Sequence, residues 1–208
     1  MSSIKLKHSG GNAVSLHPPT SAPTSSDVQF KLPTADGSAN QVLKTDGSGN
    51  LSFGADSGGL NASYARLADV KGTTTQGGSF TSGAWRTRDI TTEETDPDGI
   101  VSISSNQFTL QAGTYHIDAS CCAVGVDNHS ARIYNVTDSS TTLTGLANKN
   151  QEDNVSDYAH VRGQFTIAAA KTFELQHRCY TTVSTHGFGA YSSWNNNVYS
   201  IIEIHKRN

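Results

Sequence analysis

From Trp85 to Ile204 the sequence consists of short segments in which apolar and polar residues alternate, separated by turns rich in Gly, Asp and Asn. No stretch of this region has the apolar spacing that an amphipathic helix needs. Alternation with a period of two is typical of strands that bury one face. Many short strands joined by tight turns predict an all-β sandwich or barrel.

The apolar faces of these segments can be assigned, because successive side chains of a strand point to opposite sides. Tyr115, Ile117, Ala119 and Cys121 share one face, and Phe173, Leu175, His177 and Cys179 share another. We expect strands near residues 64–70, 86–92, 99–104, 107–110, 114–124, 131–137, 141–147, 159–167, 172–180, 187–191 and 197–205.

The last of these segments is apolar on both faces, since Tyr199 and Ile201 occupy the nominally outer one. A strand of this kind needs cover on both sides, and a subunit interface would provide it. Arg178 is a third interface candidate, because the planar guanidinium of Arg pairs with carboxylates at interfaces. A solvated strand face is the alternative for Arg178.

The apolar content of the chain is 35% and is concentrated after residue 60, where both Trp, all seven Tyr and five of the seven Phe are found. Four of the five Pro lie in the first 33 residues. Only one good core can be built, and a Pro-, Ser- and Gly-rich segment cannot offset its ordering entropy alone. We therefore predict an extended anchor or stalk at 1–57, ordered by partners, and a compact head at 58–208.

The predicted stalk contains extended pieces with Asp-Gly turns at residues 36–37 and 46–47. Such pieces bury little in a single chain. Three chains around one axis could form thin apolar layers from equivalent side chains. The candidate layer residues are Leu32, Val42, Leu43, Leu51 and Phe53.

Six sequence words over residues 80–206 support a more specific interpretation: AWRTRDITT, DPDGIVSISSNQFTLQAGTYHIDASC, ARIYNVTD, GQFTIAAAKTFELQHRC, THGFGAY and VYSIIEIHK. In this order they resemble the C1q/TNF-like jelly-roll heads at the C-terminus of bacteriophage fibre proteins. The piece KLPTADGSANQVLKTDGSGNLSF resembles connector segments of phage fibre and tail proteins. This resemblance implies a homotrimeric virion protein, assembled in the host cytoplasm, that docks onto other virion proteins through residues 1–57.

Within this interpretation the first choice is a tail fibre or spike, and a capsid-attached fibre or cement (decoration) protein is the alternative. A glycan-binding C1q-like lectin is a further alternative. Host recognition, of a surface glycan or protein, would use exposed loops. The candidate receptor-facing residues lie in the loops 148–157 and 191–197, and are Asn150, Glu152, Asp153, Trp194, Asn195 and Asn196.

No catalytic or cofactor motif is present, so we expect neither an enzyme nor a bound cofactor or metal. The histidines are scattered, and the Asp96-Pro97-Asp98-Gly99 segment fits a tight turn better than a calcium loop. Net charge is −3 with a pI near 6.2, which argues against nucleic acid as a partner. There is no apolar run of membrane-spanning length, and the three cysteines predict reduced, buried thiols rather than a disulfide.

Overall fold

The computed structural model describes residues 4–7, 9–11, 13–16, 20–21, 30–39, 41–55, 63–150 and 155–207. The chain divides into two units, Met1–Gly58 and Gly59–Asn208. Within the described ranges every regular element is a strand, and no helix is long and apolar enough to cross a membrane.

The first unit is built from two-stranded antiparallel hairpins. Strands β1 (Ile4–Lys7) and β2 (Ala13–Leu16) pair in one, and β3 (Gln41–Thr45) and β4 (Leu51–Ala55) pair in the other. The turn between β3 and β4 is closed by Asp46, whose carboxylate accepts hydrogen bonds from the backbone N–H groups of Ser48 and Asn50 at 2.8 and 3.1 Å. Gly47 has a φ of 78°, as the predicted Asp-Gly turn requires.

The candidate stalk residues lie on or beside the β3–β4 hairpin. Leu43 and Phe53 are cross-strand partners, and Leu51 lies two residues from Phe53 on the same face. Leu32, Val42, Leu43 and Phe53 are exposed, and Leu51 is half-buried. The hairpin thus leaves apolar side chains uncovered in the single chain.

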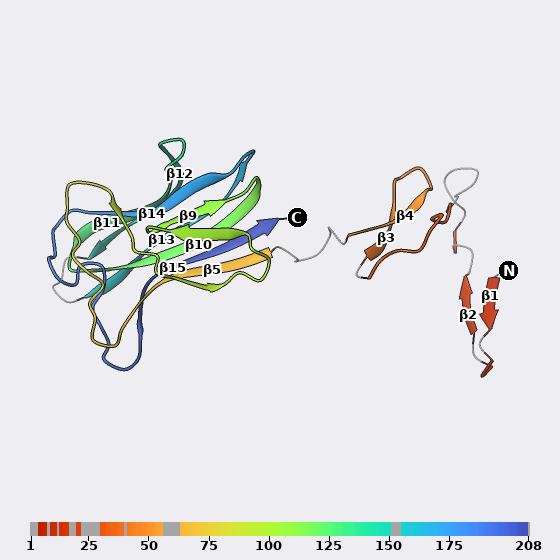
Figure 1. Ribbon diagram of the computed structural model, residues 1–208, viewed down its shortest axis with the longest axis horizontal. Helices are drawn as coiled ribbons and strands as arrows, with labels where there is room; N and C mark the ends of the chain where they lie inside the picture. Colours follow the sequence, from red (N-terminus) through yellow and green to blue (C-terminus); the bar gives the residue numbers. More distant parts are fainter. Residues whose placement is uncertain are drawn as a thin grey trace. The chain divides into compact units, whose positions relative to one another are not determined.

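The second unit is a sandwich of two antiparallel sheets (Figure 1). The first sheet has the order β13 (Ser156–Ile167), β10 (Gly113–Val124), β15 (Asn197–Arg207), β5 (Ser63–Lys71) and β7 (Thr92–Thr95). The second has the order β12 (Ser140–Asn150), β11 (Asp127–Asn135), β14 (Lys171–Cys179), β9 (Gln107–Leu110) and β8 (Val101–Ser104), and β6 (Arg86–Thr87) also pairs with β14. From β9 onward the chain changes sheet at every step except β11 to β12, which is jelly-roll connectivity. The predicted all-β jelly-roll fold is confirmed.

The core lies between the two sheets and is made by the alternating faces expected from the sequence. Tyr115, Ile117, Ala119 and Cys121 of β10 are buried, as are Phe173, Leu175, His177 and Cys179 of β14. The Phe108 and Phe173 rings stack with centroids 5.6 Å apart, on the neighbouring strands β9 and β14. Every buried apolar side chain of the described residues belongs to the second unit.

Two predicted strands differ from the structure. Residues 187–191 form no strand: Gly189 has a φ of 143°, outside the strand region, and its N–H donates back to the carbonyl group of His186 at 2.8 Å. The segment 86–92 splits, since β6 pairs in the second sheet and the first residue of β7, Thr92, pairs in the other. The chain crosses between the sheets here.

The segment starting at Asp96 is a turn, as predicted. The Asp96 carboxylate accepts hydrogen bonds from the N–H groups of Ile100 and Val101 at 2.9 and 3.0 Å, and Gly99 has a φ of 62°. Both oxygens of the carboxylate are therefore engaged by the turn itself.

Candidate functional site

The loop preceding β15 presents the most exposed aromatic side chain of the described chain. Trp194 is 89% exposed, and Asn195 and Asn196 beside it are exposed too. The exposure predicted for these three residues is confirmed, whereas their role in recognition stays a prediction. A flat apolar ring flanked by amides is suited to contacts with sugars or with protein surfaces.

The base of this loop is fixed by Asn197. Its Oδ1 atom accepts hydrogen bonds from the backbone N–H and the hydroxyl of Ser192 at 2.8 and 2.9 Å. Its Nδ2 atom donates to the carbonyl groups of Gly72 and Thr73 at 3.0 and 3.1 Å. The buried Asn197 side chain thus links the Ser192 loop to the loop of Gly72 and Thr73, and leaves Trp194 exposed for contacts.

The second predicted recognition loop is shorter than expected. Strand β12 continues to Asn150 and β13 begins at Ser156. Asn150 is 4% exposed and its amide donates to the carbonyl group of Val155, so the prediction that it faces a receptor is wrong. Its pairing with Asp127 carries the ladder to this point. Glu152 and Asp153 lie outside the described residues.

The three candidate interface residues have different surroundings. Tyr199 is 4% exposed, and its hydroxyl donates to the carbonyl group of Thr75 at 2.7 Å, so the prediction that it faces a partner is wrong. A register shift in the β15–β5 ladder between Val198 and Ser200 turns Tyr199 inward. Ile201 is half-buried and Arg178 is exposed, which leaves both free for the predicted role.

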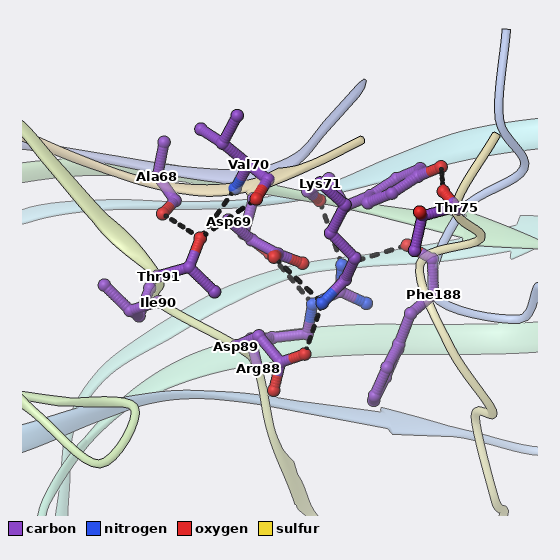
Figure 2. Close-up of polar contacts among 12 residues, drawn as sticks. Ala68, Asp69, Val70, Lys71, Thr75, Arg88, Asp89, Ile90, Thr91 and Phe188 are labelled. Atoms are coloured by element: carbon purple, nitrogen blue, oxygen red, sulfur yellow. Dashed lines mark hydrogen bonds and ion pairs between the residues drawn. The ribbon is translucent and has the colours of Figure 1, made fainter. Parts of the chain in front are cut away.

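Tyr199 lies beside the fully buried Arg88, whose importance the sequence analysis missed. The Arg88 guanidinium donates to Ser200 Oγ at 2.9 Å and to the carbonyl groups of Cys122, Phe188 and Tyr199 at 3.2, 3.0 and 2.9 Å. Its Cζ atom lies 4.0 Å from the centre of the Phe188 ring. Figure 2 shows the guanidinium directed at the Phe188 segment. Arg88 therefore ties β10, β15 and the 187–190 segment together.

A signal for Arg88 was present in the alternation of its segment. Arg88 is two residues from Ile90, which is buried, so both fall on the same face of an extended chain. Burial lowers the pKa of Arg88, and the charge of Asp69 opposes this.

A second polar group lies beside Arg88 and consists of Asp69 and Lys71 on β5 together with Asp89. The Lys71 ammonium lies 3.0 Å from the Asp69 carboxylate and 2.6 Å from that of Asp89 (Figure 2). Asp69 is buried, and its desolvation raises its pKa although Lys71 opposes the shift. Both carboxylates are used to hold Lys71, so this group stabilises the fold and offers no open acid–base pair.

A third buried group joins two strands of the second sheet to β10. His129 Nδ1 lies 3.0 Å from His177 Nε2, and His177 Nδ1 lies 3.3 Å from Cys121 Sγ. Sequence spacing did not predict this row, because His129 and His177 meet only once β11 and β14 pair. In residues 63–150 and 155–207 no group of three or more His, Cys, Asp or Glu side chains could hold a metal ion.

All three cysteines of the head are free and buried. The prediction of reduced thiols without a disulfide agrees with this geometry. Burial raises the pKa of Cys121 to about 12 and that of Cys179 to about 11. The thiols are therefore poor nucleophiles in the folded head.

No family model matches the chain, and no curated protein matches it either. Among solved structures, the chain is similar to murine APRIL, with 8% identity and a TM-score of 0.45 over 70% of this chain and 99% of the other. It is also similar to the globular domain of the zebrafish complement 1qA protein, with 13% identity and a TM-score of 0.44 over 71% of this chain and 100% of the other. Similarities this low carry no information about function, and the jelly-roll class of the head rests on its own strand order.

Proposed function

We propose that the chain is a non-enzymatic structural protein of a bacteriophage particle, a homotrimeric tail fibre or spike. Its first unit docks onto other virion proteins, and its jelly-roll head meets the host surface. The proposal rests on the sequence resemblance described above and on one structural observation, the uncovered apolar side chains at one edge of the sandwich.

That edge is formed by β12 and β13, the outermost strands of the two sheets. Leu146 of β12 is 72% exposed and Tyr158 of β13 is 50% exposed, with Val155 also exposed before β13. The two strands touch at Gly145, where a Cβ atom would lie 2.5 Å from the carbonyl oxygen of His160. Exposed apolar side chains gathered on one edge are typical of an interaction surface.

The outer face of the adjoining first sheet offers a different surface. The Tyr64 and His205 rings lie there with centroids 5.0 Å apart, and Ile201 lies between β10 and β5 on the same sheet. Contact between two different surfaces on equivalent subunits is heterologous, and it closes into a ring when the rotation permits. Within the proposal the β12–β13 edge of one subunit contacts this face of the next, and such a contact can close into a cyclic trimer.

The first unit supports the docking role. Its β3–β4 hairpin leaves apolar side chains exposed, including Leu43 and Phe53. A segment of this composition gains order by contact with other chains.

The test is the mass of the purified full chain by light scattering, for which three times 22.1 kDa is expected. Leu146→Asp should shift the mass toward that of a monomer, because it places a charge in the apolar edge. Trp194→Ala, on a loop outside both edge strands, is the matched control and should remain trimeric. A monomeric wild-type chain would refute the trimer.

The particle itself distinguishes tail from capsid. Antibody against the head, imaged on virions, should label the tail. Label on the capsid would instead establish the fibre or decoration alternative. In the same particles Trp194→Ala should reduce adsorption to host cells. Unchanged adsorption would show that the Trp194 side chain takes no part in host recognition.

A further inference from the structure

A hollow of about 840 Å³ lies on the outer face of the second sheet, where β11 begins and β12 and β14 end. This volume is in the range of roughly 300–1,000 Å³ found for small-ligand sites. The trimer contact proposed above rests on other residues, so what this hollow binds is a separate question.

Strand register arranges the outward side chains of this surface in two rows. Lys149 pairs with Asn128, and Tyr180 follows through a hydrogen bond from its N–H to the Asn128 carbonyl group at 2.9 Å. In the next row Ala147 pairs with Ser130, and Ser130 pairs with Arg178. Directly opposed side chains of antiparallel strands lie side by side on one face.

The rows explain both the shape and the charge of the hollow. Its floor is low because Ala147, Ser130 and Asn128 have short side chains. Arg178 and Lys149 stand at opposite corners, and the Tyr180 ring, 74% exposed, stands at a third. Among the residues that the structure describes, no carboxylate lines the hollow and neither cation forms an ion pair.

Residues 82–83 form another part of the lining, and hydrogen bonds hold them in place before any ligand binds. The Ser82 N–H donates to Thr182 Oγ1 at 3.0 Å. Arg86 donates to the carbonyl groups of Thr81 and Ser82 at 3.0 and 3.4 Å. A preformed wall reduces the ordering cost of binding.

We propose that this hollow binds an acidic saccharide, a sugar carrying a carboxylate or sulfate group. Arg178 and Lys149 supply charge-assisted hydrogen bonds to the acidic groups. Asn128 and Ser130 offer hydrogen bonds to hydroxyl groups, and the exposed face of Tyr180 supplies an apolar surface for a sugar ring. A nucleic acid fits less well, because the chain has a net charge of −3 and the two cations form no stripe.

The test is calorimetric titration of the full chain with two matched pairs of probes. We expect 3′-sialyllactose to bind and lactose not to bind, and trigalacturonate to bind where maltotriose does not. Arg178→Gln should weaken the binding of the acidic sugars by about tenfold or more, because a hydrogen bond to a charged group is lost. Arg207→Gln, which removes an exposed charge at the end of β15, should leave the affinity unchanged.

The proposal is overturned if neither acidic probe binds at millimolar concentration, or if Arg178→Gln and Arg207→Gln bind equally well. If inorganic sulfate competes as strongly as the acidic sugars, the hollow is a general anion site and the proposal of a saccharide ligand is refuted. The mass of Arg178→Gln separates this proposal from the trimer. A trimer that has lost sugar binding supports the site, whereas a monomer would show that Arg178 lies in the subunit interface.

Discussion

His129 Nδ1 and His177 Nε2 lie 3.0 Å apart inside the sandwich, so one imidazole donates a hydrogen bond to the other. One shared proton is enough for this contact, and both rings can remain neutral. Burial and the nearby Arg88 charge hold the pKa of His177 well below its usual 6.5. Burial also lowers the pKa of His129, with the Asp157 charge opposing the shift.

We therefore expect the head to lose stability in acid. Below about pH 6.5 the unfolded chain takes up protons on these imidazoles and the folded chain does not. The free energy of unfolding should fall as the pH drops through this range. Urea denaturation at pH 8, 7, 6 and 5 measures it.

The matched variants are His129→Gln and His186→Gln. His129→Gln should reduce the dependence of unfolding free energy on pH below 6.5, whatever it does to stability at pH 8. His186 is half-buried and lies outside this row, so His186→Gln controls for the removal of a histidine elsewhere in the head. If the unfolding free energy of His129→Gln depends on pH as strongly as that of the wild type, His129 does not contribute to the loss of stability in acid.

Arg88→Met should destabilise the head by about 3–5 kcal/mol, because each buried acceptor left without a donor costs about 1–3 kcal/mol. The carbonyl groups of Cys122, Phe188 and Tyr199 would lose their donor inside the fold. Urea denaturation at pH 7.5 measures the loss, with the exposed Arg207→Met as control. Equal stability of the two variants would show that water replaces the guanidinium at no cost.

The strand content and the inward faces of β10 and β14 were predictable because alternation is a local property of the sequence. The burial of Tyr199 was not, since a single register shift beside Val198 reverses the face of the residues around it. The contact of His129 with His177 and the four bonds of Arg88 join residues 34 to 112 positions apart. Such contacts depend on strand order, which periodicity does not contain. The hollow beside Arg178 likewise required the register of three strands.

Gly145→Ala should destabilise the head by about 1–3 kcal/mol and weaken trimerisation. A Cβ atom there would lie 2.5 Å from the His160 carbonyl oxygen and 2.7 Å from that of Ala131, so backbone must move. Gly72→Ala is the control, because its Cβ atom would meet only Thr75 Oγ1 at an ordinary 3.5 Å. Thermal denaturation and light scattering measure both effects. A Gly145→Ala protein as stable as Gly72→Ala would contradict the close strand contact.

The thiols of the folded head should be inert. With pKa values of about 12 for Cys121 and about 11 for Cys179, almost no thiolate is present at pH 8. A thiol-reactive dye should label the native protein slowly and the urea-unfolded protein at all three cysteines. Dithiothreitol should leave the melting temperature unchanged. A marked fall on reduction would reveal a disulfide and contradict the prediction of reduced thiols.

Removal of residues 1–58 should leave a folded head whose unfolding free energy changes by less than about 1 kcal/mol. Its buried apolar residues begin at Ala65, so the deletion takes nothing from the core of the described chain. Circular dichroism and urea denaturation of the truncated and full chains measure this directly. The truncated head should also fail to join virus particles, because docking is proposed for the first unit. If a folded head without residues 1–58 is still incorporated, docking is carried by the jelly roll itself.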